Sequence, residues 1–161
     1  MILYFLRHGK AAPAKDGNDA ARELTSEGEE QLRSAAPLWR RVNLRPDVVL
    51  SSPLPRAVRT AELACEAIGV NLRPLIEPSL APGAGWDQMA RALTRHTDAR
   101  RVLFVGHEPD LSTAVAELSG ASSVRLRTGG VACLEFYGVP EPGSGEIAWL
   151  LDPDLYTEDG G

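Results

Sequence analysis

Arginine and histidine side chains occur in this sequence where predicted elements end or begin. The pair Arg7-His8 directly follows an apolar run. His107 follows a second such run, and Arg56 lies at the start of a predicted helix, whose free N–H groups and dipole favour an anion. Arginine presents a planar fork of donors that suits phosphate oxygens, and a neutral imidazole can attack phosphorus in line. Together these residue types indicate a site for a tetrahedral dianion.

The elements that carry these side chains must bring them to one place. Residues 1–6 have the length and the β-branched and aromatic content of a strand buried on both faces. Strands are expected over residues 1–6, 47–52, 71–77 and 100–105, and helices over residues 24–42, 55–69, 86–96 and 111–120. Two further strands, over residues 129–138 and 145–152, flank a Pro/Gly turn and predict a hairpin.

The alternation of strands and helices predicts an α/β fold over residues 1–161. We expect a single-domain three-layer α/β/α sandwich with a largely parallel central sheet and a C-terminal hairpin. In such sheets ligands bind outside the carboxyl ends of the strands. That edge should hold the side chains that follow three of the strands, namely Arg7-His8, Ser51-Ser52 and Gly106-His107.

Local signals place the first predicted helix and the segment before it. Ser26 and Glu29 have capping-box spacing, which predicts a helix that begins there. Pro37 should kink this helix, because proline lacks the N–H donor that a helix interior needs. The preceding residues 10–23 are polar and are expected to form a flexible connection.

Composition and charge exclude several classes of protein. The 161 residues are 43% hydrophobic and 24% charged with a net charge of −5, which is typical of a globular protein and not of a nucleic-acid or anionic-membrane binder. No apolar stretch approaches the roughly 20 residues of a membrane span. No signal peptide is recognisable, so a cytoplasmic location is expected. Cys65 and Cys133 are far apart and are expected to be free buried thiols.

Three ordered motifs, "LRHG", "SSPLPRAVRTAE" and "VGHEPDLS", resemble those of the histidine phosphatase superfamily. The short chain is most similar to the bacterial phosphohistidine phosphatases of the SixA type, which implies a phosphoglycerate mutase-like fold. The resemblance implies that His8 is the nucleophile and forms a covalent phosphohistidine that water hydrolyses. It also implies that Arg7, Arg56 and His107 clamp the phosphoryl group. Arg22 would be an additional phosphate-binding residue, and no metal or cofactor would be required.

One part of the wider family pattern has no match here. Many larger relatives carry an acidic residue after the RHG motif and a glutamate general acid in a later loop. Here Lys10 follows the motif, and the later loop offers Glu77 and Asp87 without matching the acid motif. A general acid typically contributes about 10²–10⁴-fold when an alcohol leaves, whereas a phosphorylated imidazole can leave after protonation by solvent. The expected substrate is therefore a phosphohistidine-bearing protein domain, with inorganic phosphate as product.

Other functions stay open on the sequence alone. A small-molecule phosphomonoesterase of the same superfamily would take a small phosphate ester, and a non-catalytic module would bind phosphate without turnover. A metallohydrolase is disfavoured, because the chain has three histidines and one of them adjoins Arg7. Nucleic-acid and membrane partners are not expected. Ser51 and Ser52 are expected to be turn and cap residues. Glu108 is expected to be a loop carboxylate, with roles in orienting His107 or as an acid left open.

Overall fold

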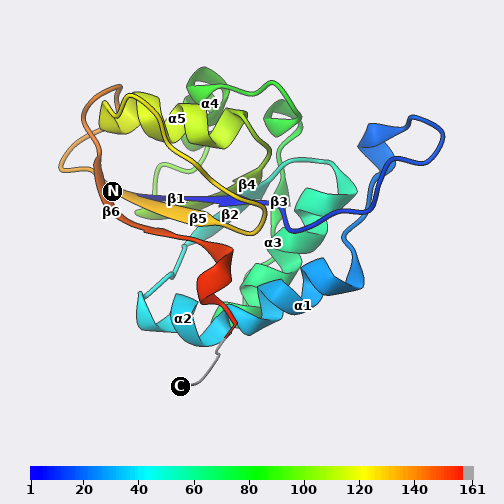
Figure 1. Ribbon diagram of the computed structural model, residues 1–161. Coiled ribbons are helices and arrows are strands. Elements are labelled where there is room, and N and C mark those ends of the chain that lie inside the picture. Colours follow the sequence, from blue (N-terminus) through cyan, green and yellow to red (C-terminus); the bar gives the residue numbers. More distant parts are fainter. Residues whose placement is uncertain (158–161) are drawn as a thin grey trace.

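Within residues 1–157, which the computed structural model describes, six strands form one sheet in the order β3-β2-β4-β1-β5-β6 (Figure 1). The strands are β1 (Ile2–Arg7), β2 (Val48–Ser51), β3 (Leu75–Ile76), β4 (Arg101–Gly106), β5 (Val131–Glu135) and β6 (Glu146–Leu151). β1 to β4 are mutually parallel, whereas β5 runs antiparallel to β1 and forms the predicted hairpin with β6. The largely parallel sheet is therefore confirmed.

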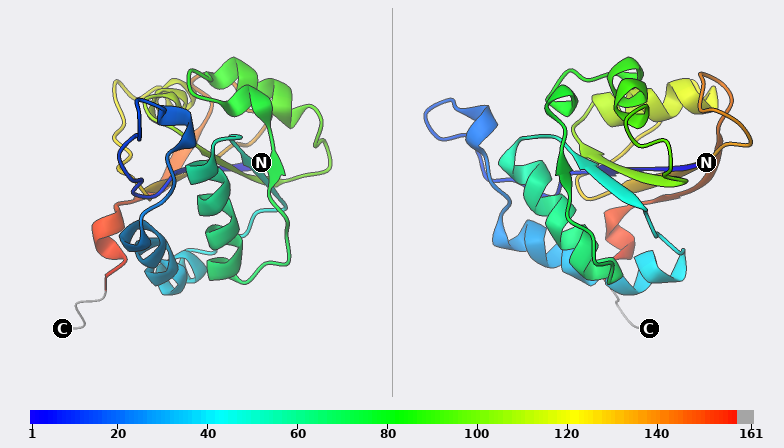
Figure 2. Two further views of the ribbon diagram at one scale, coloured as in Figure 1. Left: turned by 90° about the vertical axis from the view of Figure 1, so that its right-hand side faces the viewer. Right: turned by 180° about the vertical axis from the view of Figure 1, so that it is seen from behind.

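Helices cover both faces of this sheet. The α-helices are α1 (Ser26–Ser34), α2 (Ala36–Arg41), α3 (Pro55–Ile68), α4 (Trp86–Leu93) and α5 (Asp110–Ser119), and three-residue 3₁₀ turns span Asp19–Ala21 (η1), Pro78–Leu80 (η2) and Pro153–Leu155 (η3). Figures 1 and 2 show α1, α2 and α3 on one face of the sheet, and α4 and α5 on the other. This arrangement is the predicted three-layer α/β/α sandwich.

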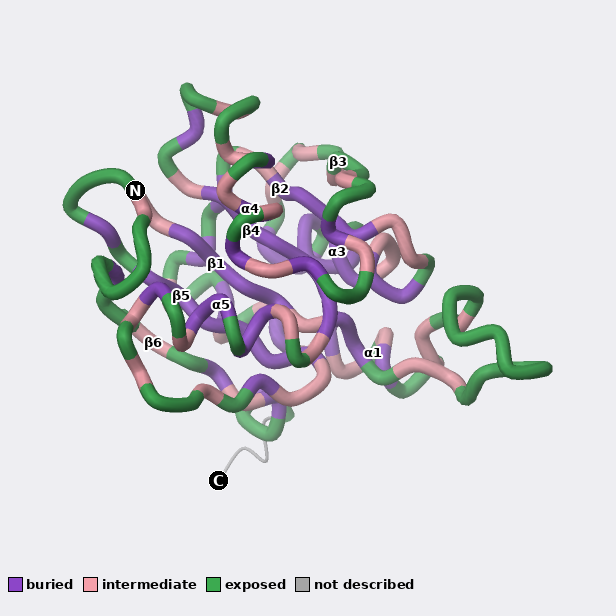
Figure 3. The backbone as a smooth tube through the Cα atoms, turned by 90° about the horizontal axis from the view of Figure 1, so that it is seen from above, coloured by how far each residue is buried: buried purple, intermediate pink, exposed green. Residues whose placement is uncertain are grey.

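The central strand β1 contributes side chains to two separate cores. Tyr4 and Leu6 pack on the α1–α3 side, whereas Leu3 and Phe5 pack on the α4–α5 side. All four are at most 2% exposed, and the tube in Figure 3 is correspondingly purple along β1 and β4. Because successive side chains of a strand point to opposite faces, the part of β1 that is covered on both faces, Leu3 to Leu6, is apolar at every position. Burial on both faces of the sheet therefore explains why the sequence opens with an uninterrupted apolar run.

The register of the parallel strands sets the level at which each strand ends. Arg7 of β1 pairs with Gly106 of β4, and Ser51 of β2 pairs with Val105 of β4. The residues that follow these strands therefore emerge side by side at the carboxyl edge of the sheet. The predicted convergence of the three strand ends is confirmed.

Two features of the helical layer differ from the sequence-based expectation. Thr25, not Ser26, caps α1, and its hydroxyl accepts a hydrogen bond from the N–H of Gly28. The capping-box assignment to Ser26 was wrong by one residue, because threonine and serine are adjacent and either can serve as a cap. The predicted kink near Pro37 is a complete break, since α1 ends at Ser34 and α2 begins at Ala36.

The polar segment 10–23 has more structure than predicted. Isolated β-bridges join Ala11 to Leu24 and Lys15 to Asn18, and η1 follows. Figure 1 shows the segment reaching away from the sheet and returning to α1. Among the helices of residues 1–157, none has the length and apolar character needed to cross a membrane.

Candidate active site

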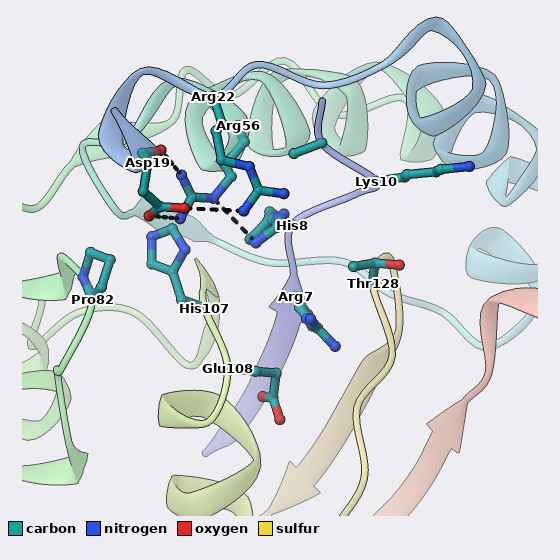
Figure 4. Close-up of a pocket in the computed structure, with 11 residues that line it drawn as sticks. Arg7, His8, Lys10, Asp19, Arg22, Arg56, Pro82, His107, Glu108 and Thr128 are labelled. Carbon is teal, nitrogen blue, oxygen red and sulfur yellow. Dashed lines mark hydrogen bonds and ion pairs between the residues drawn. The ribbon is translucent and has the colours of Figure 1, made fainter. Parts of the chain in front are cut away.

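A cavity of about 420 Å³ opens at the carboxyl edge of the sheet. All five residues predicted to bind or attack phosphate line it. Figure 4 shows the side chains of His8, Arg22, Arg56 and His107 close together, with Arg7 next to them at the end of β1. Its lining consists of Arg7, His8, Lys10, Ala11, Asp19, Arg22, Arg56, Pro82, His107, Glu108 and Thr128. Four of these side chains are cationic and two are carboxylates, so the cavity is suited to an anion although the whole chain carries a net charge of −5.

The His8 ring is held in one tautomer by the main chain. Its Nδ1 lies 2.7 Å from the carbonyl oxygen of Gly9. A carbonyl oxygen only accepts hydrogen bonds, so Nδ1 must carry the proton. The lone pair of the neutral ring then resides on Nε2, which accepts a hydrogen bond from Nε of Arg56 at 3.3 Å. His8 thus presents a nucleophilic nitrogen beside a guanidinium group, although the residue as a whole is 7% exposed.

Arg56 is the most buried cation of the site, with 4% of its surface exposed. It lies in the first turn of α3, where two prolines precede it and Pro55 begins the helix. Besides its contact with His8, it donates from Nη1 to the main-chain oxygen of Asp19 at 2.9 Å and from Nη2 to the Asp19 carboxylate at 3.1 Å. The exposed carboxylate of Asp19 therefore occupies donors that an incoming phosphoryl group could use.

His107 lies next to His8, with 5.3 Å between the two ring centroids. Its Nε2 is 2.6 Å from the hydroxyl of Ser52, which follows β2. Its Nδ1 is buried and has no hydrogen-bond partner within the described part of the chain. Sequence reasoning assigned Ser52 to a turn, and its contact with His107 was missed because the two residues are 55 positions apart.

Both imidazoles are held neutral by their surroundings. Burial is the largest cause that lowers the pKa of His8 to about 4, and Arg56, Arg7 and Arg22 lower it further. Burial likewise lowers the pKa of His107 to about 4, with added repulsion from His8, Arg56 and Arg7. A neutral His8 keeps the lone pair that nucleophilic attack requires.

The other two arginines approach the cavity from different elements. Arg7 ends β1 and donates from Nη1 to the carbonyl oxygen of Leu126 at 3.0 Å, while its buried Nε lacks a partner within residues 1–157. Arg22 follows η1, donates to the carbonyl oxygen of Ala12 at 2.7 Å and pairs with Asp19 at 3.1 Å. The return of the polar segment to α1 is thus what brings Arg22 to the site.

Close packing holds the loop after β1 against two helices. The hydroxyl of Thr60 donates to the carbonyl oxygen of Arg56 at 2.7 Å and accepts the N–H of Gly9 at 3.0 Å, which ties the loop to α3. On α1, a Cβ at Gly28 would lie 2.4 Å from the carbonyl oxygen of Lys10, so only glycine permits this contact. Sequence reasoning assigned no role to Thr60, although it lies in the motif "SSPLPRAVRTAE", or to Asp19, which lies in a polar segment without a motif.

The acidic side chains in and near the site either lie outside the cavity or have other contacts. Glu77 and Asp87 are not among the residues that line the cavity, and Glu77 pairs with Arg95 and Ser79. Glu108 does line it, but one of its carboxylate oxygens accepts the N–H of Ser112 in α5 at 2.9 Å. Hydrogen bonding to Arg22 is the main cause that lowers the pKa of Asp19, which therefore stays ionised.

Two further observations concern metals and thiols. Within residues 1–157 we find no group of three or more His, Cys, Asp or Glu side chains placed to hold a metal ion. Cys65 and Cys133 are both buried and unpaired, as expected from their spacing.

Comparisons with known proteins agree with this geometry. Residues 3–81 match the model of the histidine phosphatase superfamily (branch 1). The chain is 37% identical to an uncharacterised protein of Picosynechococcus over 115 residues, which is 69% of this chain and 68% of that protein. It is 27% identical to the Escherichia coli phosphohistidine phosphatase SixA over 156 residues, covering 95% of this chain and 94% of that one.

A solved structure of the protein histidine phosphatase SixA with tungstate superposes with a TM-score of 0.82. The two chains are 27% identical, and the match covers 98% of this chain and 100% of that one. The chain, with its RHG strand end and its second histidine beside it, belongs to the histidine phosphatase superfamily.

Proposed function

We propose that this protein is a cofactor-independent phosphatase that removes phosphate from phosphohistidine on a protein, through a covalent intermediate on His8. The observation that carries the proposal is the state of His8. Its Nδ1 proton is committed to the Gly9 carbonyl, so the lone pair of Nε2 lies in a cavity lined by three arginines and His107. Such a nitrogen can attack phosphorus while the surrounding donors hold the phosphoryl oxygens.

The proposed reaction has two steps. In the first, Nε2 of His8 forms a bond to phosphorus while the bond from phosphorus to the substrate nitrogen breaks, and that nitrogen takes a proton from solvent. Phosphorylation places positive charge on the His8 ring, and the hydrogen bond from Nδ1 to Gly9 stabilises it. In the second step water attacks phosphorus, the bond to Nε2 breaks, and inorganic phosphate leaves with neutral His8 restored.

The arginines hold the transferring group during both steps. We expect Arg7, Arg22 and Arg56 to bind its equatorial oxygens, with His107 as a further donor. Arg56 would exchange its contacts with Asp19 and with Nε2 of His8 for contacts with phosphate. The guanidinium group of Arg56 already lies beside Nε2 of His8, so this exchange of partners needs no large movement of the arginine.

The substrate class is inferred from the environment of the carboxylates. Asp19 is ionised and bound to two arginines, and Glu108 accepts a main-chain hydrogen bond, so neither is set up as an acid for an alcohol leaving group. A phosphorylated imidazole has less need of such an acid. The similarity to a protein named phosphohistidine phosphatase supports the same substrate class.

The test compares turnover of a phosphohistidine-bearing protein domain with turnover of aryl and sugar phosphates under identical conditions. We expect kcat/KM for the protein substrate to exceed that for each ester by at least about 10²-fold, the contribution typical of a general acid. His8→Ala should abolish turnover of every substrate. Faster hydrolysis of a small ester would support the phosphomonoesterase alternative, and phosphate binding without any turnover would support a binding module.

A further inference from the structure

Ser52 connects the end of β2 to the second histidine of the site. The side chain is fully buried, and within residues 1–157 its Oγ makes two hydrogen bonds. One joins it to Nε2 of His107 at 2.6 Å. The other comes from the N–H of Leu54 at 3.3 Å, for which Oγ is the acceptor.

The direction of the hydrogen bond to His107 follows from counting protons. A serine hydroxyl has one proton and two lone pairs. If Nε2 of His107 donated, Oγ would accept two hydrogen bonds, and its own proton would be buried without an acceptor among the described residues. That arrangement is unfavourable, because a buried polar group that loses its hydrogen bonds to water and gains none in the protein destabilises the fold. With the Ser52 hydroxyl donating to Nε2 and the N–H of Leu54 donating to Oγ, every polar atom on this side of the ring is paired, and only Nδ1 of His107 is left without a partner among the described residues.

Because Nε2 of His107 accepts this hydrogen bond, the single proton of the neutral ring must be on Nδ1. Nδ1 is buried and has no partner within residues 1–157, and His107 lines the cavity beside His8 (Figure 4). We propose that Ser52 is a positioning residue that fixes the tautomer of His107, so that Nδ1–H is available to donate to a phosphoryl oxygen. The donation from Nδ1 to a phosphoryl oxygen rests on the proposed function, whereas the assignment of the tautomer does not.

A hydroxyl is chemically well suited to this position. A carboxylate in its place would orient the ring with the opposite polarity, because it accepts from the imidazole and stabilises the imidazolium form. Serine supplies a donor without adding a charge near Arg56 and Arg7. In the other tautomer the lone pair of Nδ1 would be available toward the phosphoryl oxygens and would repel them.

The tautomer can be measured directly in the wild-type protein. We expect two-dimensional ¹⁵N–¹H spectra at neutral pH to show His107 with a protonated Nδ1 and an unprotonated Nε2, whether or not the protein turns over any substrate. A protonated Nε2, or two protonated nitrogens, would overturn the role of Ser52. If this tautomer is found in a protein that has no phosphatase activity, the proposed function fails and the assignment of Ser52 stands.

Variants test whether the tautomer matters for catalysis. Ser52→Ala should lower kcat/KM for the phosphoprotein by about 10–100-fold, the usual effect of losing a residue that orients another, and should remove the single-tautomer signature. Ser52→Thr keeps the hydroxyl and should show a kcat/KM and a single-tautomer spectrum like those of the wild type.

Ser51→Ala is the matched control. Ser51 is an equally buried serine, but its hydroxyl donates to the Ser52 carbonyl and not to His107. Equal losses of kcat/KM in Ser51→Ala and Ser52→Ala would overturn the proposal. If Ser52→Ala does not fold, the tautomer seen in the wild-type spectrum decides it.

Discussion

The ends of β1 and β4 look alike in sequence but differ in how their histidines are held. Both strands have an apolar centre, lie side by side in register and are followed at once by a histidine. His8 is fixed through Nδ1 by a main-chain carbonyl, whereas His107 is fixed through Nε2 by a side-chain hydroxyl. The nitrogen left for the site is therefore Nε2 in His8 and Nδ1 in His107. Neighbouring groups, not the strand-histidine pattern itself, determine which chemistry each imidazole can perform.

This difference predicts unequal roles for two rings in nearly the same environment. Both have a pKa lowered to about 4, mainly by burial. His8 offers a lone pair, which suits a nucleophile, and the proposed tautomer of His107 offers a proton, which suits a donor to an oxyanion. Substitution of each ring should separate these roles.

The largest effect is expected from replacing the proposed nucleophile. His8→Ala should lower kcat by roughly 10⁴-fold or more, because no covalent intermediate can form. His107→Ala should lower kcat by about 10²–10³-fold, the usual loss for one donor to an oxyanion. Steady-state assays on one phosphoprotein substrate measure both, and circular dichroism checks the fold. Equal losses in the two variants would contradict the division of roles.

A smaller loss is expected from the cation that contacts His8. Arg56→Ala should weaken the binding of vanadate or tungstate and lower kcat/KM by about 10²–10³-fold. Arg59→Ala is the control, since Arg59 lies one turn later on α3 and pairs with Glu29 and Glu62, not with any residue of the cavity. Calorimetric titration measures the oxyanion affinity. Unchanged affinity in Arg56→Ala would show that the clamp does not include this residue.

The neutral state of His8 should be visible in the pH dependence of stability. Its pKa is about 4 in the folded protein and 6.5 in the reference state, so the unfolded chain binds more protons between these values. The free energy of unfolding should therefore fall as pH drops from about 6.5 to about 4, by up to about 1.4 kcal/mol per pH unit. Urea titrations should show a shallower fall in His8→Ala than in the wild type, and parallel curves would contradict a depressed pKa.

The smallest effect concerns the residue that ties the loop after β1 to α3. Thr60→Val keeps the shape of the side chain but leaves the N–H of Gly9 without its acceptor. We expect a loss of about 1–3 kcal/mol in the free energy of unfolding, as for other buried donors that lose a partner. Thr113→Val, at an exposed position of α5, should change stability by less than about 0.5 kcal/mol in the same denaturant titration. If the free energy of unfolding falls equally in the two variants, the hydrogen bond between Thr60 and Gly9 does not stabilise the fold as predicted.

Local pattern was sufficient to predict much of this fold. The apolar runs ending at Arg7 and Gly106 predicted parallel strands, and parallel strands must bring their carboxyl ends to one edge. The alternation of elements predicted a layered α/β structure, and Gly69 ends α3 in the left-handed conformation that favours glycine. These features are set by residues close together in the chain.

Other parts of the site depend on contacts between distant residues. Asp19 lies in a polar segment without periodicity, and the β-bridge between Ala11 and Leu24 helps to bring it to Arg56. Ser52 and Thr60 are ordinary residues of a strand end and a helix, and their contacts with His107 and Gly9 span more than 50 positions. Sequence pattern carries no signal for such pairs, because the hydrogen bonds exist only after the layers have packed.

The most direct test of the account is to trap the phosphorylated enzyme. The protein would be mixed with a radiolabelled phosphohistidine domain, quenched in alkali, in which phosphohistidine is stable, and digested for mass spectrometry. The account predicts label on Nε2 of His8 in the wild type and none in His8→Ala. Label on His107, or turnover of the substrate without any labelled histidine in the enzyme, would contradict it.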